Sequence, residues 1–387
     1  MILEEEQNAS HLVEFAVLET RKGFCKKAIL QLQAVESLRC VVSLTADGVQ
    51  INSLPTLDMT AQLLKTRGSH AFALRTEGEG AEAGALLPQP VLCCAGKKKL
   101  MLYRWGGQGF DEWKEMALPD TPACMAWCGD SLCVGVGRRY VIINAQTGAE
   151  KPLFDSNSSP PAVFRLPGLQ EMLLGRDSIS VFQDFEGRPS RKYAITWAAP
   201  PSAIVYSHPY VIALLPKSVE VQLMETQKAV QTISLRAGAV VPSPRDDAAY
   251  VLANNQVYRL RPVPVGRQID SLMEAGGFET ALRLCEMCSD RPEVAAKADG
   301  VHRAYGLQLL SERDFEAAVS QLARCASLDP REVLSYFPDL CPEGFPPAAS
   351  PLDLKGHQML RAQVSLIKYL NALRRRRAAP AGGGHCG

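Results

Sequence analysis

Short apolar runs, each followed by a polar turn and then by an alternating run, recur along the first two thirds of the chain. The clearest example joins residues 133–136 to residues 140–143. Runs of this kind, rich in β-branched residues and separated by turn residues, predict β-hairpins. Five segments follow the pattern closely, and a sixth follows it loosely: 92–105, 132–145, 171–184, 210–224 and 249–262, with 38–54 as the sixth.

The even spacing of these hairpins indicates a repeated unit. The five closest matches start at residues 92, 132, 171, 210 and 249, which are 40, 39, 39 and 39 residues apart. Such a period, with a hairpin in each unit, is typical of β-propeller blades. An all-β sandwich with evenly spaced hairpins is the alternative. The Gly- and Glu-rich segment 76–90 is predicted to be a flexible insertion, which explains the one longer interval.

After Pro264 the hydrophobic period changes from that of strands to that of helices. Phe278 and Phe315 each begin a predicted helix and are followed by an acid and by small residues, as in an α-solenoid repeat. Four segments with helical spacing form two predicted pairs, 268–275 with 278–288 and 302–311 with 315–325.

Two further helices extend this predicted helical region. Asp329 is expected to cap a helix that starts at Pro330. A long helix is predicted over 352–377, and residues 378–387 have the composition of a disordered tail. The apolar positions of the long helix are Val364, Ile367, Leu370 and Leu373.

Composition and charge narrow the class of protein. The 387 residues carry 42 Lys+Arg and 41 Asp+Glu, a net charge of +1 that gives no long-range attraction for nucleic acid. No apolar stretch approaches the roughly 20 residues of a membrane span, and the N-terminus lacks the pattern of a signal peptide. The 12 cysteines are scattered, many within apolar runs, which favours buried thiols in a reducing compartment. The sequence therefore predicts a cytoplasmic protein.

Candidate reactive groups do not assemble into a recognisable site in the sequence. Cys285 and Cys288 have zinc-ligand spacing, but they lie on a predicted amphipathic helix without a second ligand pair nearby. Cys124 and Cys128 flank Trp127 at positions typical of core residues. The six histidines lie outside any recognisable Ser or Cys nucleophile motif, and no phosphate-binding loop occurs. We therefore expect no enzyme activity, no cofactor, no metal and no small-molecule substrate.

Two basic clusters are candidate contact sites. One lies in a predicted hairpin turn and the other at the end of the long helix. The turn is either a solvated one that prevents edge pairing or a contact for an acidic protein or a lipid headgroup. The helix end is either solvated, since cations suit the C-terminal dipole, or a weak contact with anionic lipid that lacks an apolar anchor. The residues are Lys97, Lys98 and Lys99, and Arg374, Arg375, Arg376 and Arg377.

Several motifs resemble a known family. Segment 97–105, followed by 119–128, closely resembles the citron-homology (CNH) propeller of the Vam/Vps-type subunit of the HOPS vacuolar tethering complex. Segments 210–216 and 261–264 do so as well, and 335–340 is similar to its clathrin-heavy-chain-repeat region. The receptor-associated adaptor family of the related CORVET tether is similar, but less so at residues 125–128.

The resemblance covers residues 24 to about 373 and implies a domain order. A divergent segment, 1–23, precedes a CNH-type propeller over 24–264, an α-solenoid over 265–377 and the tail over 378–387. The family propeller has seven blades, so this one is expected to be incomplete at its N-terminus. The family chain also continues to a C-terminal zinc-finger region that docks onto the complex.

The resemblance also implies a function. It indicates a non-catalytic scaffold that tethers vesicles before fusion, peripheral at late endosome and lysosome membranes. The implied partners are other HOPS tethering subunits and a late-endosomal Rab GTPase, with no nucleic acid. Two alternatives stay open: a CNH signalling adaptor, receptor-associated or regulating a GTPase, and a truncated form unable to assemble.

Overall fold

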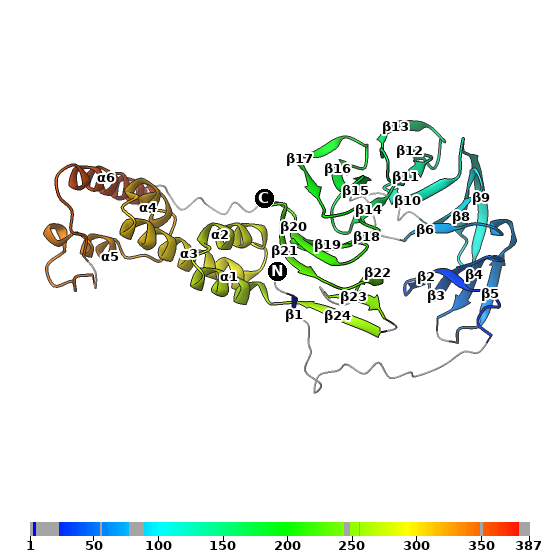
Figure 1. Ribbon diagram of the computed structural model, residues 1–387, viewed down its shortest axis with the longest axis horizontal. Coiled ribbons are helices and arrows are strands. Elements are labelled where there is room, and N and C mark those ends of the chain that lie inside the picture. Colours follow the sequence, from blue (N-terminus) through cyan, green and yellow to red (C-terminus); the bar gives the residue numbers. More distant parts are fainter. Residues whose placement is uncertain are drawn as a thin grey trace, which may run out of the picture. The chain divides into compact units, whose positions relative to one another are not determined.

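The computed structural model divides the chain into two compact units, Leu3–Arg261 and the residues from Pro262 onward (Figure 1). Most of the predicted insertion 76–90 and of the tail 378–387 lies outside the described residues, as does most of segment 1–23. The structure describes residues 3–4, 23–54, 56–76, 89–243, 248–254, 256–348 and 351–378.

The first unit is a β-propeller of six four-stranded sheets. The first blade contains β2 (Ile29–Val35), β3 (Cys40–Thr45), β4 (Gly48–Ser53) and β5 (Met59–Leu63), and the second contains β6 (Ala71–Arg75), β7 (Val91–Gly96), β8 (Lys99–Trp105) and β9 (Phe110–Ala117). The third contains β10 (Pro122–Cys128), β11 (Ser131–Val136), β12 (Arg139–Asn144) and β13 (Glu150–Asp155), and the fourth contains β14 (Val163–Leu166), β15 (Glu171–Arg176), β16 (Ile179–Asp184) and β17 (Pro189–Thr196).

The fifth blade contains β18 (Ala203–Ser207), β19 (Tyr210–Leu214), β20 (Val219–Leu223) and β21 (Lys228–Ile233). The sixth contains β22 (Ala237–Pro242), β23 (Ala249–Ala253) and β24 (Gln256–Pro262), and β1 (Leu3–Glu4) from the N-terminal end is its fourth strand. Six radial sheets exclude the sandwich alternative. The described residues thus form six blades, whereas the resemblance implies seven for the family.

The predicted hairpins are the two middle strands of each blade. In β11 and β12, for example, Cys133 pairs with Ile142 and Val134 with Val141. Cys133 and Val134 are neighbours that point to opposite faces, and both are fully buried. Because the second to fifth blades each pack between two others, their middle strands are apolar on both faces, which explains the continuous apolar runs in the sequence.

Side chains that hydrogen-bond to backbone join neighbouring blades. The Gln31 side chain of β2 both donates to the Phe72 carbonyl, at 2.8 Å, and accepts from the Phe72 N–H, at 2.9 Å. Trp127 Nε1 of the third blade donates to the Ala73 carbonyl of the second at 3.0 Å. Gln222 of the fifth blade donates to the Thr196 carbonyl of the fourth at 2.8 Å. These bonds fix how one blade sits on the next.

The two blades at the ends of the series each keep an apolar side uncovered. The innermost strands pack in turn from β2 through β6, β10, β14 and β18 to β22, whereas the described residues show no comparable packing of β22 on β2. Leu30 and Leu32, which alternate with Gln31 and so face away from the second blade, are 58% and 55% exposed. Val241 and Leu252 of the sixth blade are also exposed.

Tyr140 provides a test of the contacts between blades. Its fully buried hydroxyl accepts from the Ala162 N–H at 2.8 Å and donates to the Gly175 carbonyl at 2.6 Å, joining the third blade to the fourth. Tyr140→Phe leaves both groups unsatisfied and should lower the free energy of unfolding by about 1–3 kcal/mol, measured by urea denaturation. Tyr258→Phe is the control, because the Tyr258 hydroxyl donates only to the Gln256 side chain among the described residues. This variant should leave the free energy of unfolding nearly unchanged. Equal losses of stability in the two variants would contradict the role of the Tyr140 hydroxyl in joining the blades.

The second unit is helical. Its helices are α1 (Val265–Glu274), α2 (Phe278–Met287), α3 (Pro292–Ser311), α4 (Phe315–Leu322), α5 (Pro330–Ser335) and α6 (His357–Ala378). A 3-10 turn, Pro338–Leu340, lies between α5 and α6. The propeller contains a 3-10 turn of its own, Leu64–Thr66, after β5. Asp329 caps α5 as predicted, accepting from the Arg331 N–H at 2.9 Å. The predicted start of α3 at residue 302 is wrong. Pro292 starts it, and the intervening turns bury too few residues to show helical spacing.

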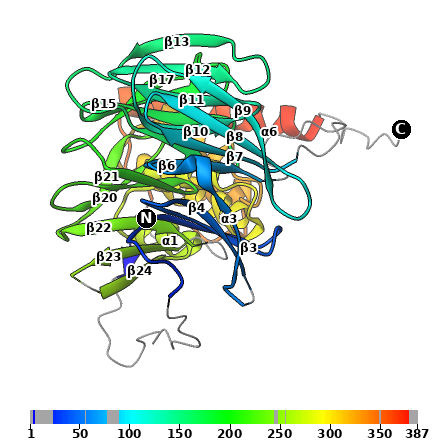
Figure 2. The ribbon, with the colours of Figure 1, turned by 90° about the vertical axis from the view of Figure 1, so that its right-hand side faces the viewer.

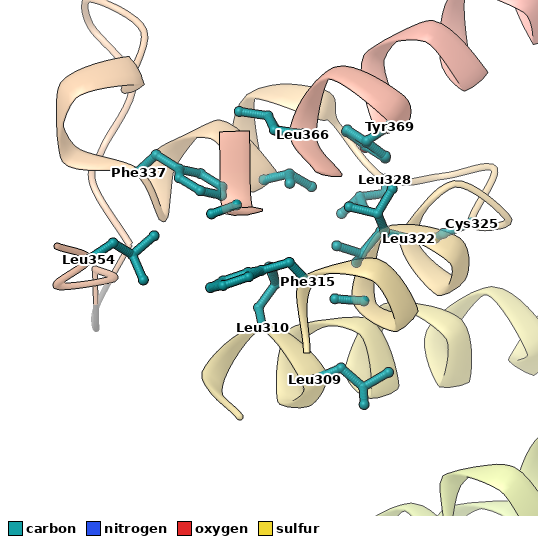
Figure 3. Packing of buried hydrophobic residues seen from close by; sticks show 14 residues of the cluster. Leu309, Leu310, Phe315, Leu322, Cys325, Leu328, Phe337, Leu354, Leu366 and Tyr369 are labelled. Atoms are coloured by element: carbon teal, nitrogen blue, oxygen red, sulfur yellow. The ribbon is translucent and has the colours of Figure 1, made fainter. Parts of the chain in front are cut away.

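The core of the helical unit gathers residues from α3 to α6 (Figure 3). Phe315 and Leu322 of α4 meet Leu366 and Tyr369 of α6. A Cβ on Gly306 would lie 2.5 Å from Leu322 Cγ, so glycine allows α3 and α4 to pack closely. The buried residues of α6 are Ala362, Ser365, Leu366 and Tyr369, whereas Val364, Ile367 and Leu370, which the sequence marked as its apolar positions, are exposed.

Helix α6 also begins later than predicted, at His357 rather than at residue 352. Pro351 and Gly356 precede it, and Gly356 has a φ of 56°, which interrupts a right-handed helix. The segment before the helix instead contributes Leu354 to the core.

Asp299 provides a pH-dependent test of the helical unit. Its carboxylate accepts from the backbone N–H groups of Ala326, at 3.0 Å, and Ser327, at 2.9 Å. Burial raises its pKa, but these bonds outweigh burial and the pKa is lowered overall. Asp299→Asn should reduce the free energy of unfolding by about 1 kcal/mol at neutral pH.

A carboxyl whose pKa is lowered on folding stabilises the protein fully above its unfolded pKa, about 3.9, and this contribution is lost as the pH falls through the folded value. The difference between the native chain and Asp299→Asn in urea midpoint, followed by helix circular dichroism, should therefore shrink below about pH 4. Asp290→Asn, at an exposed carboxyl, is the control. A difference that grew at low pH would contradict this account.

Candidate interaction surfaces

The lysine cluster lies where the sequence placed it, in the turn between β7 and β8 (Figure 2). Lys97 and Lys98 are exposed, and Lys98 adopts a φ of 56° in the tight turn. Lys99 is half-buried and donates to the Glu115 carboxylate of β9 at 3.1 Å. The exposed cations of this turn are therefore Lys97 and Lys98, while Lys99 helps to hold the outer strand.

The arginine cluster lies in the last turn of α6. Arg374 and Arg375 are exposed and make no ion pair among the described residues. Arg376 is exposed but donates to the carbonyls of Ala323, at 3.4 Å, and Cys325, at 3.3 Å. The Arg377 side chain lies outside the described part of the chain. The structure thus places the two basic clusters in different units rather than in one site.

A pocket of about 630 Å³ on the second blade is a surface that the sequence reasoning missed. The Arg104 guanidinium lies 3.5 Å from the centre of the Trp113 ring, a close cation–π contact. The edge-to-face pair of Trp105 and Phe110 lies at the same end of the hairpin, with ring centres 5.0 Å apart. The lining includes Gln89, Pro90, Arg104, Trp105, Asp111, Glu112 and Trp113.

Pairing between β8 and β9 builds this second-blade pocket. Arg104 pairs with Asp111, and Trp105 pairs with Phe110. The pairing register between β8 and β9 shifts at Leu102 and Tyr103, which changes which side chains of β9 point to each face of the blade. The sequence pattern alone therefore does not show on which face of the blade Trp113 lies. Aromatic faces beside both signs of charge suit a peptide side chain better than a reaction, since the lining includes no nucleophile with a base.

Of the cysteines that the sequence singled out, Cys128, Cys285 and Cys288 are buried, and Cys124 is half-buried against the core. Cys285 and Cys288 of the α2 end are both buried, and burial raises the pKa of Cys285 to about 11, with a smaller contribution from Cys288. Burial likewise raises the pKa of Cys124 to about 11 and that of Cys128 to about 12. Across the ranges that the structure describes, no group of three or more His, Cys, Asp or Glu residues could hold a metal ion.

These pKa values predict the reactivity of the thiols. At pH 8 a thiol with a pKa of about 11 is ionised in roughly one molecule in a thousand, and only the thiolate reacts. Iodoacetamide labelling of the native protein, followed by mass spectrometry, should modify Cys25 and Cys341, which are partly exposed, and leave Cys285 unmodified. Labelling of all three in urea is the control. Fast modification of native Cys285 at neutral pH would show that its burial is wrong.

The chain is thus a six-bladed β-propeller followed by helices. None of the described helices has the length and the hydrophobicity needed to cross a bilayer.

Comparison with known proteins identifies the domain that the propeller forms. The family model for the CNH domain matches residues 16–242. The chain is 30% identical to the human Vam6/Vps39-like protein over 95% of its own length and 42% of that relative's. It is 32% identical to vacuolar sorting protein 39 of Arabidopsis thaliana, covering 85% of the chain and 32% of the relative. It is 25% identical to the human transforming growth factor-beta receptor-associated protein 1, covering 92% and 43%.

The chain belongs to the CNH-domain family, among the Vam6/Vps39-like and transforming growth factor-beta receptor-associated proteins. This confirms the family and the propeller that the sequence motifs indicated. The chain spans less than half the length of these relatives.

Proposed function

We propose that this chain is a non-catalytic tethering subunit that acts in vesicle fusion at late endosomes and lysosomes. The observation that carries the proposal is the 30% identity to the human Vam6/Vps39-like protein along 95% of the chain, together with the CNH match over residues 16–242. We further propose that its partners are other subunits of a HOPS-like tether and a GTP-bound late-endosomal Rab GTPase, and that it is cytoplasmic and peripheral at those membranes.

The physical basis of this function is binding without chemistry. Blades joined by bonds such as that of Trp127 to Ala73 form a rigid body whose loops are held in fixed places. Lys97 and Lys98 project from one such loop, and we propose that they contact an acidic protein surface. The second-blade pocket, with Arg104 and Trp113, lies at the opposite end of the β7–β8 hairpin, and we propose that it accepts a side chain of a partner protein.

Affinity capture tests this proposal. The full chain, immobilised and exposed to cell extract with GTP-loaded or GDP-loaded Rab GTPase, should recover tethering subunits and prefer the GTP form. Lys97→Glu with Lys98→Glu should weaken capture about three- to tenfold, since each exposed charge contributes modestly. Arg138→Glu with Lys217→Glu, in the equivalent turns of the third and fifth blades, is the matched control and should leave capture unchanged.

A receptor-associated adaptor is the second candidate function. It is favoured by the 25% identity to the transforming growth factor-beta receptor-associated protein 1 over 92% of the chain. Recovery of receptor tails without any tethering subunit in the same capture experiment would support this adaptor. That outcome would also contradict the tethering proposal.

A further inference from the structure

Helix α6 has two apolar faces, and only one of them is covered. Ala362, Leu366 and Tyr369 are buried in the core that α6 shares with α4. Leu360, Val364 and Ile367 are 62%, 55% and 59% exposed. Their spacing of four and then three residues places them in one stripe along the helix, and the exposed Leu370 extends it. We call these four residues the α6 stripe.

The charged side chains that α6 itself carries have a single sign, while Glu316 of the neighbouring α4 interacts with Lys368 and Arg361. The sequence of α6, His357–Ala378, contains no Asp or Glu. Arg361, Arg374 and Arg375 are exposed on the same helix. Lys368 is partly neutralised, since it donates to Glu316 of α4 at 2.7 Å. An exposed apolar stripe with cations at both ends therefore occupies the outer side of this helix.

We propose that α6 binds the surface of an anionic lipid membrane. The α6 stripe would enter the boundary between headgroups and acyl chains, while Arg361, Arg374 and Arg375 reach the anionic headgroups. These three cations alone would bind weakly, and the α6 stripe supplies the apolar anchor that the basic end of the helix lacks by itself. From Leu360 to Leu370 the stripe extends about 15 Å at the usual helical rise, so the helix lies along the surface rather than across the bilayer.

The packing of α6 favours a lipid surface over a partner helix. Among the described residues, α6 packs chiefly against α4, on the side opposite the stripe. The stripe is therefore the crest of a single helix, whereas a docking helix is usually received in a groove between elements. A second copy of the chain would bring two acid-free, cationic faces together, and their repulsion opposes that arrangement. A flat, negatively charged surface satisfies both the shape and the charge.

This inference goes beyond the proposed tethering function, because it requires no partner protein. The test is co-sedimentation of the full chain with vesicles of phosphatidylcholine containing about one quarter phosphatidylserine, in about 0.15 M salt. We expect binding to these vesicles and none to pure phosphatidylcholine. Arg374→Glu with Arg375→Glu should weaken binding by at least about tenfold. Val364→Gln with Ile367→Gln should weaken it by a similar factor.

Two control variants are matched to these changes. Leu340→Gln alters an exposed apolar residue of the same unit, and Arg138→Glu with Lys217→Glu reverses two exposed cations in the propeller. Both should bind vesicles as the native chain does. Since the α6 substitutions lie on the exposed side, helix circular dichroism should be unchanged, which separates lost binding from lost folding.

Three outcomes would overturn the proposal. The first is a native chain that binds anionic and neutral vesicles equally or binds neither. The second is binding that the α6 variants leave intact. The third is self-association in sedimentation equilibrium that Val364→Gln with Ile367→Gln abolishes, in a chain that does not bind vesicles, which would assign the stripe to a protein interface. None of these outcomes bears on capture of tethering subunits, so the two proposals can fail separately.

Discussion

Both faces of a propeller blade are apolar, and only neighbouring blades can cover both. This constraint explains why Cys133 and Val134, adjacent in the sequence and pointing in opposite directions, are each fully buried. It also explains why the hairpin repeats along the chain, since one blade alone would leave both of its apolar faces in water. Polar side chains such as Gln31 and Trp127 then fix each blade on the next, because hydrogen bonds have a direction that apolar burial lacks.

The same constraint explains how much of the fold could be predicted from the sequence. The middle strands of each blade were predictable because burial on both faces makes them apolar throughout, as in β19 and β20. Outer strands such as β13 are largely exposed and carry little pattern, so their existence follows only from the period. The pairing of β1 with β24 joins opposite ends of the propeller sequence, and a two-residue strand gives no local signal.

The candidate surfaces were predictable to different degrees for related reasons. The lysine turn was found because a hairpin must turn where its apolar runs end, and Lys98 lies at that point. The second-blade pocket depends on the register between β8 and β9, where a shift determines which residues face Arg104. The sequence pattern also does not show that the apolar stripe of α6 is exposed. Helix α6 has more apolar residues than one face can hold, and only its packing against α4 shows which of them are buried.

The central claim is that a rigid propeller and a helical unit act together as a binding scaffold of a vesicle tether. The most direct measurement is a calorimetric titration of the purified chain with a purified late-endosomal Rab GTPase, loaded in turn with a GTP analogue and with GDP. The account predicts saturable binding of the GTP form and much weaker binding of the GDP form. Absence of binding to both forms, with a correctly folded chain and an active Rab GTPase, would contradict it.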